Sequence, residues 1–304
     1  MANFPIKWLM LCREPRLYSC QRIKTACEQR GILLDILDPN RMLLKLASVG
    51  GKSTARLFYQ TSEQELQLDE YHAVLPRFGT TSTEMGCYVL QHFEIKKTKV
   101  LNNAQAFRLA RDKWQSLQLL AAYGLPIPST SYIGELVESS SQLALHFPAV
   151  VLKTLVGMQG TGVELYEETS TALNKLKMLK QVGEKALVQD FIAETRGQDI
   201  RAFVIGDQVV ASMQRTAGNG DFRANLHQGG KAESIELTEE EKQIAIQATK
   251  AIGLDVAGVD LIRAKQGPMI LEANASPGLE GIEKVSGKDI AGMMVDYLLT
   301  GILG

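Results

Sequence analysis

The sequence of 304 residues has no run of 18 or more apolar residues, and its N-terminus has no hydrophobic signal region. These absences argue against a membrane-spanning or exported protein. The formal net charge is only −1, so no overall basic surface points to nucleic acid or an anionic membrane as a partner. Any anionic ligand must therefore be held by local cations.

Cysteine is scarce, and its four copies form no Cys-x-x-Cys pair; they are Cys12, Cys20, Cys27 and Cys87. We interpret them as reduced thiols packed in or near helices, as in intracellular proteins. With 45% hydrophobic and 22% charged residues, the composition is typical of a soluble globular protein. We expect a cytoplasmic enzyme or binding protein.

Two common nucleotide-binding motifs are missing as well. Residues 50–54 read Gly-Gly-Lys-Ser-Thr, but a P-loop needs a glycine five residues before its Gly-Lys pair, and that position holds Leu46. We interpret this stretch as a surface turn before a strand at 56–59. No Gly-x-Gly-x-x-Gly follows the first predicted strand, residues 6–11, so a dinucleotide-binding fold has little support.

The first third of the chain alternates between predicted strands and helices. Strands at 6–11 and 32–37 flank a helix at 19–30, and a strand at 74–78 precedes a helix at 83–94. This β-α-β order predicts a parallel sheet. The composition changes near residues 102–112, which predicts an N-terminal domain at 1–110 and a second domain at 111–304.

A lysine and a glycine-rich loop are the first candidate site of the second domain. Lys153 interrupts an apolar strand at 149–155 and is followed by a loop with three glycines, Gly157, Gly160 and Gly162. Such glycines let backbone N–H groups approach a phosphate. The pattern predicts a β-hairpin clamp over phosphates; the alternative is an edge-strand lysine that reaches out to water.

Three oxygen-bearing side chains lie on a predicted hairpin at 256–275. Glu272 and Asn274 are two residues apart on one strand and so share a face, and pairing of the strands can place Asp260 opposite them. Oxygen ligands of this kind favour Mg²⁺ held together with phosphates and water. The alternative is that these are ordinary solvated residues of an edge strand.

Other polar residues fit the same region. Asp190 and Phe191 at a strand end could hold an adenine edge. Asp199 and Arg201 share a strand face and form either a simple ion pair or an acceptor and an anion clamp. Arg215 and Arg223 could bind carboxylate or phosphate in a bidentate manner. For His227 we favour a loop hydrogen bond over a role as general base.

Taken in order, these motifs resemble the ATP-grasp superfamily, and within it the RimK-type alpha-L-glutamate ligases. The resemblance covers nearly the whole chain. The matching stretches include Arg111-Asp112-Lys113, Asp199-Ile200-Arg201, Gly220-Asp221-Phe222-Arg223-Ala224-Asn225-Leu226-His227 and Glu272-Ala273-Asn274-Ala275-Ser276-Pro277-Gly278-Leu279-Glu280-Gly281-Ile282. The resemblance to the RimK type rests mainly on residues 220–227 and 276–282.

The resemblance implies a mixed α/β and α+β protein. A parallel α/β pre-ATP-grasp domain, 1–110, would precede a two-lobed ATP-grasp domain, 111–304. The lobe at about 111–189 would carry the glycine loop, and the lobe at about 190–304 would bind metal. The family is often tetrameric, so a homo-oligomer is expected.

The resemblance also implies roles for single residues. The ATP phosphates would be bound by Lys153, Lys113 and the glycine loop, and adenine and ribose by Asp190, Phe191 and Asp199. Arg223 and Asn225 would bind nucleotide or substrate, and Arg201 or Arg223 would stabilise an oxyanion. Two Mg²⁺ or Mn²⁺ ions would be held by Asp260, Glu272 and Asn274.

The implied activity is ATP-dependent addition of L-glutamate through an acylphosphate. The acceptor would be the C-terminal glutamate of a small-subunit ribosomal protein, with no direct binding of nucleic acid or membrane. The alternatives are a free amino acid, poly-glutamate or a cofactor tail as acceptor, and, with less support, a non-catalytic ATP-binding regulator. Three features depart from the family pattern and leave the acceptor open: Asp190 in place of Glu, Gln228 in place of Arg, and no basic residue in 216–219.

Overall fold

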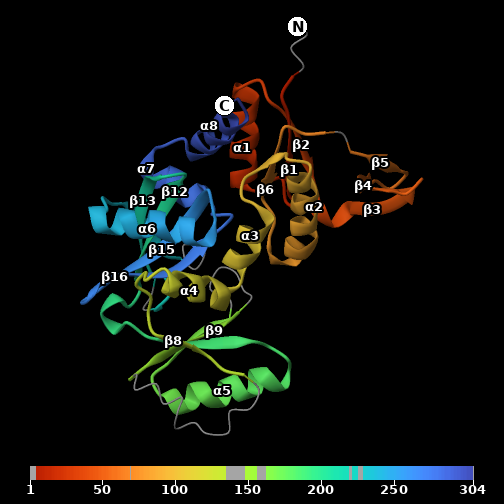
Figure 1. The fold of residues 1–304 in the computed structure, drawn as a ribbon. Coiled ribbons are helices and arrows are strands. Elements are labelled where there is room, and N and C mark those ends of the chain that lie inside the picture. The colour runs from red at the N-terminus through yellow and green to blue at the C-terminus, as the bar shows by residue number, and fades with distance from the viewer. Residues whose placement is uncertain are drawn as a thin grey trace. The chain divides into compact units, whose positions relative to one another are not determined.

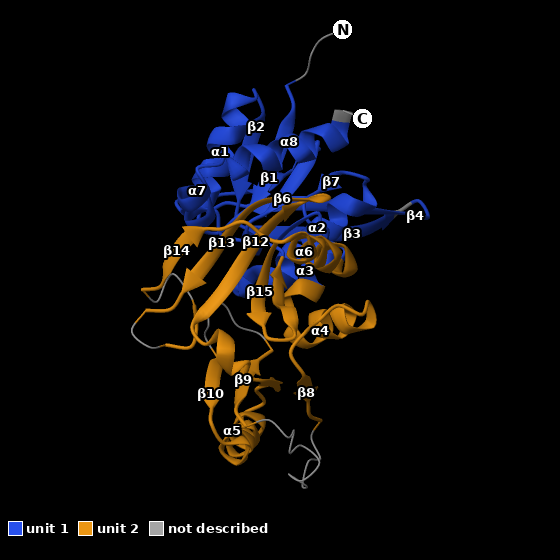
Figure 2. Cartoon of the chain, turned by 90° about the vertical axis from the view of Figure 1, so that its left-hand side faces the viewer, with its two compact units in different colours: residues 1–108, 253–257, 275–304 blue, residues 109–252, 258–274 orange. Residues whose placement is uncertain are grey.

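The computed structural model of the protein describes residues 5–68, 70–134, 148–155, 162–218, 221–224 and 229–303. The chain forms two compact units (Figure 2): unit 1 comprises residues 1–108, 253–257 and 275–304, and unit 2 comprises residues 109–252 and 258–274. Within the described ranges, no helix combines the length and apolar composition needed to span a bilayer.

Unit 1 contains the parallel sheet that the β-α-β order predicts. Its strands run in the order β2-β1-β6-β7, and every neighbouring pair is parallel. The strands are β1 (Lys7–Leu11), β2 (Leu33–Leu37), β6 (Ala73–Pro76) and β7 (Lys99–Val100). Helix α1 (Tyr18–Gln29) connects β1 to β2, and helix α2 (Thr83–Ile95) connects β6 to β7 (Figure 1). The side chains of β1 from Trp8 to Leu11 are all fully buried, as expected for a sheet covered on both faces.

A second sheet in unit 1 was not predicted. It is antiparallel, in the order β3-β4-β5, and consists of β3 (Met42–Val49), β4 (Lys52–Gln60) and β5 (Glu65–Gln67). Gly50 and Gly51, both with positive φ, form the turn between the first two strands. The stretch at 50–54 is thus a turn rather than a P-loop, as predicted, but the strand after it begins at Lys52 rather than at residue 56. The first half of β4 is exposed, so it lacks the apolar alternation by which strands are recognised.

Residues 253–257 and 275–304 complete unit 1. The second of these segments contains the last helices of the chain, α7 (Glu280–Ser286) and α8 (Ile290–Leu303). Arg22 of α1 forms an ion pair with Glu283 at 2.9 Å, and Arg30, which caps the C-terminal end of α1, forms one with Asp296 at 2.6 Å. These contacts fasten α1 to the C-terminal helices.

Asn102 explains why residues 253–257 and 275 belong to unit 1. Its side chain is 1% exposed and donates to the carbonyls of Val256 at 2.7 Å and Ala275 at 2.8 Å. Its Oδ1 accepts from the backbone N–H groups of Asp255 and Val256 at 2.8 and 2.9 Å. The side-chain amide of Asn102 thus satisfies backbone groups both in residues 253–257 and in the segment that begins at residue 275. The division of the sequence into domains at 1–110 and 111–304 stays a prediction, because these units are defined by contacts rather than by continuous sequence.

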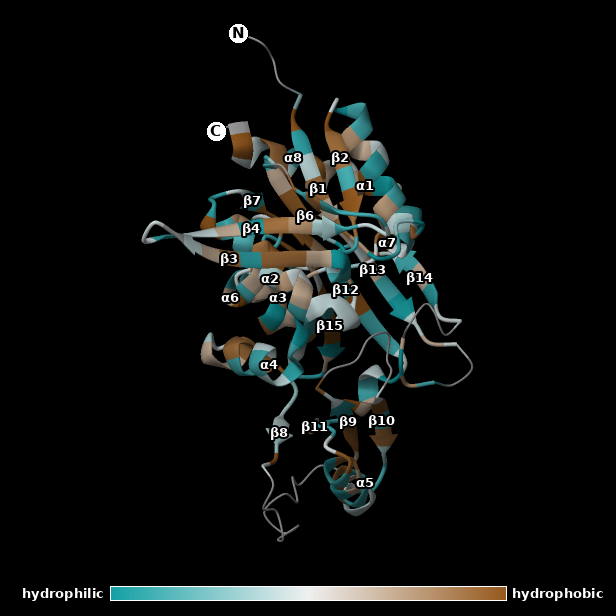
Figure 3. Ribbon diagram, turned by 90° about the vertical axis from the view of Figure 1, so that its right-hand side faces the viewer, coloured by the Kyte–Doolittle hydropathy of each residue, from teal (hydrophilic) through white to brown (hydrophobic). Residues whose placement is uncertain are grey.

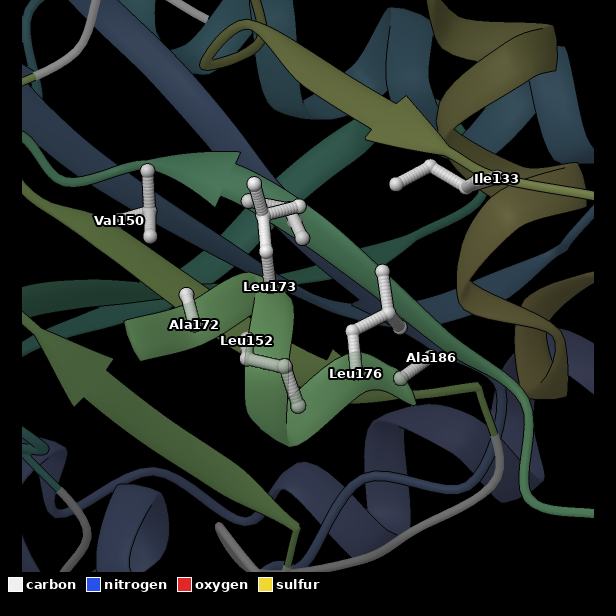
Figure 4. Close-up of a cluster of buried hydrophobic side chains, with 8 residues drawn as sticks. Ile133, Val150, Leu152, Ala172, Leu173, Leu176 and Ala186 are labelled. Carbon is white, nitrogen blue, oxygen red and sulfur yellow. The ribbon is translucent and has the colours of Figure 1, made fainter. Parts of the chain in front are cut away.

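Unit 2 contains a small antiparallel sheet with one helix against it. The order is β10-β9-β11-β8, and the strands are β8 (Thr130–Tyr132), β9 (Val150–Thr154), β10 (Val163–Tyr166) and β11 (Ala186–Asp190). Helix α5 (Thr169–Gln181) contributes Ala172, Leu173 and Leu176 to a buried cluster with Val150 and Leu152 of β9 (Figure 4). The ribbon of β9 and β10 is accordingly mostly hydrophobic in colour, whereas α5 carries both colours (Figure 3).

The larger sheet of unit 2 has five strands, in the order β14-β13-β12-β15-β16. They are β12 (Gln198–Ile205), β13 (Gln208–Thr216), β14 (Lys231–Ser234), β15 (Val256–Ala264) and β16 (Gly267–Asn274). Helix α6 (Glu239–Ile252) packs against β12, β13 and β16. It begins with the predicted capping box: Glu241 N donates to Thr238 Oγ1 at 3.2 Å, and Thr238 N donates to Glu241 Oε2 at 2.9 Å.

The chain has three further helical segments that bear on the site. They are α3 (Ala104–Arg111), α4 (Lys113–Ala122) and the 3₁₀ turn η3 (Ala193–Thr195). Asp112 caps α4, because its carboxylate accepts from the N–H groups of Trp114 and Gln115, both at 3.0 Å. The cap fixes the start of α4 and with it the position of Lys113.

Candidate functional site

The hairpin of β15 and β16 brings the three predicted metal ligands together. Asp260 is the register partner of Glu272, and Gly258 is the partner of Asn274, so the predicted pairing is confirmed. Directly opposite residues of an antiparallel pair share a face. Asn274 Nδ2 donates to Glu272 Oε1 at 3.0 Å, so these two side chains also point the same way. The register shifts after Asp260, a bulge of the kind often found beside functional sites.

Asp260 lies in a buried network of four charged residues. Its carboxylate is bound by Arg201 through two guanidinium nitrogens and by Arg215 at 2.8 Å. Arg215 also holds both oxygens of Asp199, at 2.6 and 2.7 Å. The network joins side chains from β12, β13 and β15, and Asp199 and Arg215 are register partners on β12 and β13.

The pKa values of this network follow from burial and pairing. Burial alone would raise the pKa of Asp260, but Arg201 and Arg215 overcome it and hold the pKa at about 2. For Asp199 burial prevails: it raises the pKa to about 6, with the charge of Asp260 adding to it and Arg215 opposing it. The pKa of Arg215 is raised, because its two carboxylates outweigh the effect of burial.

These contacts change the interpretation of three predicted residues. Asp199 and Arg201 share a strand but are not paired with each other, since Asp199 binds Arg215 and Arg201 binds Asp260. Arg215 does bind carboxylate in a bidentate manner, but the carboxylate is that of Asp199. Only 6% of Arg215 is exposed, so its charge is balanced inside the protein.

Lys153 lies on β9, which has β10 on one side and β11 on the other. The alternative of an edge-strand lysine is therefore wrong. Its Nζ donates to Gln189 Oε1 at 2.6 Å, and Gln189 Nε2 donates to Thr130 Oγ1 at 2.8 Å. Burial lowers the pKa of Lys153 to about 8; Glu272 and Asp260 oppose this effect and Lys113 adds to it. These charges lie close enough to Lys153 to act on it.

Lys113, at the start of α4, belongs to the same group of charges. Burial lowers its pKa, and the charge of Glu272 opposes this effect. Two partly desolvated lysines thus share the acidic partner Glu272. A lysine removed from water gains most from an anion with several charges, which a chain of phosphates supplies.

Gly162 is the one glycine of the predicted phosphate loop that the structure describes. Its φ is +74°, and a Cβ there would overlap Thr154 Oγ1. Its carbonyl accepts from Thr154 N at 2.9 Å. The positive φ and the lack of space for a Cβ both require glycine at this position, directly before β10. Gly157, Gly160, Asn225, His227 and Gln228 lie outside the described residues.

Asp190 and Phe191 stand at the end of β11. Their backbone N–H groups donate to the carbonyls of Ser129 at 2.8 Å and Ala149 at 3.2 Å, so a bound base would have to be recognised by other groups here. Burial raises the pKa of Asp190, and Glu194 adds to the shift. The ring of Phe191 lies edge-on to that of Phe222, with centroids 6.1 Å apart.

Arg223 follows Phe222 in the same segment. Its guanidinium binds the carboxylate of Asp221 at 2.9 Å, and its backbone N–H donates to that carboxylate at 2.9 Å. This contact raises the pKa of Arg223 and lowers that of Asp221. Unlike Arg215, Arg223 remains partly exposed and could reach a ligand.

Sequence reasoning missed Gln189 as a partner of Lys153. Its side chain is 1% exposed, and its amide contacts Lys153 and Thr130, which are distant in sequence. The available signal was its place in the apolar strand Ala-Leu-Val-Gln-Asp, because a buried amide needs partners.

The donor chemistry of the hairpin fits a hard divalent cation. Glu272 and Asn274 are partly exposed and supply oxygens, with the amide nitrogen of Asn274 already used by Glu272 and by the carbonyl of Gly258. Both oxygens of Asp260 accept from arginines, although a carboxylate keeps further lone pairs. No group of three or more acidic, histidine or cysteine side chains in the described ranges has the arrangement of a metal site. A site here therefore depends on Asn274 and on oxygens of the ligand.

Two family models match the chain. The RimK PreATP-grasp domain matches residues 6–107, and the RimK-like ATP-grasp domain matches residues 110–298. Together they cover nearly the whole sequence.

Curated relatives cover the same length. A probable alpha-L-glutamate ligase of Haemophilus ducreyi is 56% identical over 301 residues, which is 97% of this chain and 99% of the relative. A probable alpha-L-glutamate ligase of Haemophilus influenzae is 57% identical over 295 residues, covering 96% and 97%.

Solved structures share the fold at lower identity. The ATP-grasp ligase PsnB, complexed with a phosphomimetic variant of its minimal precursor, Mg and ADP, is 21% identical with a TM-score of 0.73, covering 99% of this chain and 100% of PsnB. A RimK domain ATP-grasp protein from Sphaerobacter thermophilus is 22% identical with a TM-score of 0.70, covering 96% and 99%. The expected fold, a parallel α/β region followed by an ATP-grasp region, is therefore confirmed.

Proposed function

The chain belongs to the RimK family of ATP-grasp ligases, and we propose that it adds L-glutamate to the C-terminal glutamate of a small-subunit ribosomal protein. Its relatives named alpha-L-glutamate ligase make it an ATP-dependent ligase.

One observation carries the proposal: Lys153 and Lys113 lie within electrostatic reach of the hairpin carboxylate Glu272. Two lysines desolvated around one carboxylate form a place for a polyanion that brings its own counter-cation. Mg-ATP has this charge pattern, because its phosphates suit the lysines and its metal suits the carboxylate and amide oxygens.

The reaction would proceed in two steps. An oxygen of the acceptor carboxylate attacks the γ-phosphorus of ATP, and the bond to ADP breaks, which leaves an acylphosphate. The amine of L-glutamate then attacks the acyl carbon, a C–N bond forms and inorganic phosphate departs. Neither step needs a side-chain nucleophile, so catalysis depends on positioning and charge.

Each candidate residue has a defined task. Lys153 and Lys113 bind the phosphate oxygens, and Gln189 orients the ammonium of Lys153. Arg201 or Arg223 donates to the tetrahedral oxyanion of the second step. Asp190, Phe191 and Asp199 would contact the nucleoside, and Gly157, Gly160, Gly162 and Asn225 would complete the phosphate and substrate contacts.

Asp260, Glu272 and Asn274 are the residues that would hold Mg²⁺ or Mn²⁺. When bound, the ions would neutralise charge on the β- and γ-phosphates. The PsnB complex contains Mg and ADP, which supports Mg²⁺ as the first ion to test.

A ribosomal acceptor also implies a cytoplasmic protein. We also propose that the protein forms a homo-oligomer, because the ligases that it resembles are often tetrameric. Light scattering of the purified protein tests this proposal. A peptide acceptor is consistent with PsnB, which has also been solved in complex with a precursor peptide. If the acceptor is a different one, we expect the cause to lie at the positions that depart from the family pattern, which are Asp190, Gln228 and residues 216–219.

Mass spectrometry of reaction mixtures tests the proposal. Purified protein, Mg-ATP and L-glutamate are incubated with ribosomal proteins of the small subunit, with free glutamate or with a cofactor carrying a carboxylate tail. The expected product is one ribosomal protein heavier by whole glutamyl residues, with ADP formed in proportion. Products only from free glutamate would favour poly-glutamate synthesis, and ATP turnover absent with every acceptor would favour a regulator.

A further inference from the structure

The parallel sheet of unit 1 has a topological switch point between β1 and β6. The chain leaves β1 through α1 toward β2, and it leaves β6 through α2 toward β7, on the other side of the sheet order. Neighbouring strands whose connections depart in opposite directions leave a crevice at their carboxyl ends, where α/β proteins bind ligands. The predicted nucleotide and metal residues all belong to unit 2, so the proposed function assigns nothing to the carboxyl ends of β1 and β6.

Arg77 stands at this point, directly after β6. Its backbone N–H donates to the carbonyl of Leu11, the last residue of β1, at 2.9 Å. Its guanidinium donates to the carbonyl of Pro277 at 3.0 Å and acts on the thiols of Cys12 and Cys20. The side chain is only partly exposed.

The charge of Arg77 is not balanced by a carboxylate. In the part of the chain that the structure describes, no acidic side chain lies within ion-pair distance of it, although Arg13, Arg22 and Arg30 of the same unit each have one. Burial lowers the pKa of Arg77, and only the two thiols act in the other direction. A desolvated guanidinium without an anion is costly, so an arginine kept here calls for an external partner.

The thiols are a weak substitute for that partner. Cys12 and Cys20 are 3.2 Å apart and almost fully buried. The hydrogen bond from Cys12 lowers the pKa of Cys20 to about 7, against the effect of burial and with help from Arg77. At neutral pH such a pair carries only part of a negative charge. The planar fork of a guanidinium matches two oxygens of one carboxylate better.

We propose that Arg77 is a specificity residue that binds a non-reacting carboxylate of a glutamyl substrate at the switch point of unit 1. The identity of the anion rests on the proposed function, because the substrates of a glutamate ligase carry such carboxylates. Free L-glutamate and the acceptor's C-terminal glutamate share this chemistry, and the test separates them.

Isothermal titration calorimetry of the full-length protein is the direct test. The probes are L-glutamate and a Glu-Glu dipeptide, with L-glutamine and Gln-Gln as partners that lack the side-chain carboxylate. We expect Arg77→Gln to weaken at least one acidic probe by about tenfold or more, as for loss of a charged hydrogen-bonded pair, and to abolish the preference over its amide partner. Arg77→Lys keeps the charge without the fork and is expected to lie between Arg77→Gln and the wild type.

Arg13→Gln is the matched control. Arg13 lies two residues beyond the end of the neighbouring strand β1, but it already contacts Asp38 at 3.8 Å and Thr81 at 3.0 Å. We expect its loss to change probe affinity by less than about twofold, as for an exposed ion pair. Thermal melts of every variant verify the fold, and Arg77→Lys replaces Arg77→Gln as the decisive variant if the latter does not fold.

The inference would be overturned if the wild-type protein bound neither acidic probe, or if Arg77→Gln left probe affinity unchanged. It would also be overturned if the double variant Cys12→Ser, Cys20→Ser lost as much probe affinity as Arg77→Gln, because Arg77 would then serve the thiols rather than a ligand. The outcomes for the two proposals differ. Ligation with unchanged substrate affinity in Arg77→Gln refutes only this inference. Arg77-dependent binding without any ligated product in the wild type supports it and refutes the proposed function.

Discussion

The ammonium of Lys153 donates a hydrogen bond of 2.6 Å to the side-chain oxygen of Gln189, and the two residues lie on the neighbouring strands β9 and β11. Gln189 is in turn fixed by its donation to Thr130 at 2.8 Å. The lysine is thus oriented by a neutral partner, which leaves its positive charge available. A carboxylate at position 189 would instead neutralise it.

The first prediction concerns this neutral partner. Gln189→Glu adds a negative charge beside Lys153, which should raise the pKa of Lys153 above about 8 and weaken ATP use several-fold. The pH profile of kcat/KM for ATP measures both effects, with Gln189→Met as the uncharged comparison. We expect the fall of kcat/KM at alkaline pH to move to higher pH in Gln189→Glu and not in Gln189→Met. Identical pH profiles for the two variants would contradict this prediction.

The second prediction separates the function of Lys153 from its effect on stability. The pKa of about 8, against an ordinary 10.5, corresponds to a burial cost of about 3 kcal/mol. Lys153→Met should therefore abolish ATP turnover and raise the free energy of unfolding at pH 7. Lys177→Met, on the exposed side of α5, should leave both unchanged.

The sign of the pH dependence follows from the same values. Between about pH 8 and 10.5 the unfolded wild type binds more protons at Lys153 than the folded protein, so this group makes stability rise with pH. The advantage of Lys153→Met should be largest below pH 8 and shrink toward pH 10.5. Urea denaturation at several pH values measures it, and an advantage independent of pH would refute the assignment of the pKa shift.

The third prediction tests the metal assignment at Glu272. Glu272→Ala should abolish turnover and leave the fold intact, because its carboxylate accepts from Asn274 at the surface of the hairpin rather than inside a core. Turnover over a range of Mg²⁺ and Mn²⁺ concentrations, together with a thermal melt, provides the measurement. Glu233→Ala, at an exposed position of β14, is the control. Near-wild-type ligation by Glu272→Ala would exclude Glu272 as a metal ligand.

The fourth prediction compares Arg223 with Lys52. Arg223→Ala should weaken nucleotide or substrate use by about tenfold or more, since it removes a partly exposed guanidinium. Lys52→Ala should have almost no effect, because Lys52 is exposed at the start of β4 after the Gly50–Gly51 turn. KM values for ATP, glutamate and acceptor decide between them, and the reverse ranking would reopen the interpretation of residues 50–54.

The fifth prediction concerns Arg215, which holds Asp199 and Asp260 together. Arg215→Leu leaves Asp199 without its arginine and Asp260 with Arg201 alone, and it should cost about 3–5 kcal/mol of stability. Lys242→Ala breaks an exposed ion pair with Glu239 and should cost less than about 1 kcal/mol. Urea denaturation of both variants measures the difference; equal costs would mean that the network contributes little to folding.

Local patterns predicted much of the candidate site. Alternation along a strand and a Gly-Pro turn predicted that Asp260, Glu272 and Asn274 share one face, and β15 and β16 have this register. The parallel sheet of unit 1 and the capping box at Thr238 also followed from spacings of a few residues. The roles of these residues toward nucleotide and metal remain predictions.

Contacts between distant residues were beyond sequence reasoning. Residues 45–48 of β3 and the first half of β4 are exposed and carry no apolar alternation, so the second sheet of unit 1 was missed. The partner of Asp199 could have been its neighbour Arg201, and only strand pairing made it Arg215. Asn102 similarly binds residues more than 150 positions away.

The sequence by itself determined the elements outside the second sheet of unit 1, the residue types of the site and, through the order of motifs, the family, because these depend on local spacing. The tertiary structure alone decided which charges are balanced. Two arginines and two aspartates balance one another in the network around Asp260, Lys153 keeps its charge beside Gln189, and Arg77 has no carboxylate within ion-pair distance among the described residues. The physical reason is that desolvation and pairing depend on what folding brings within a few ångströms, and no spacing along the chain records that distance.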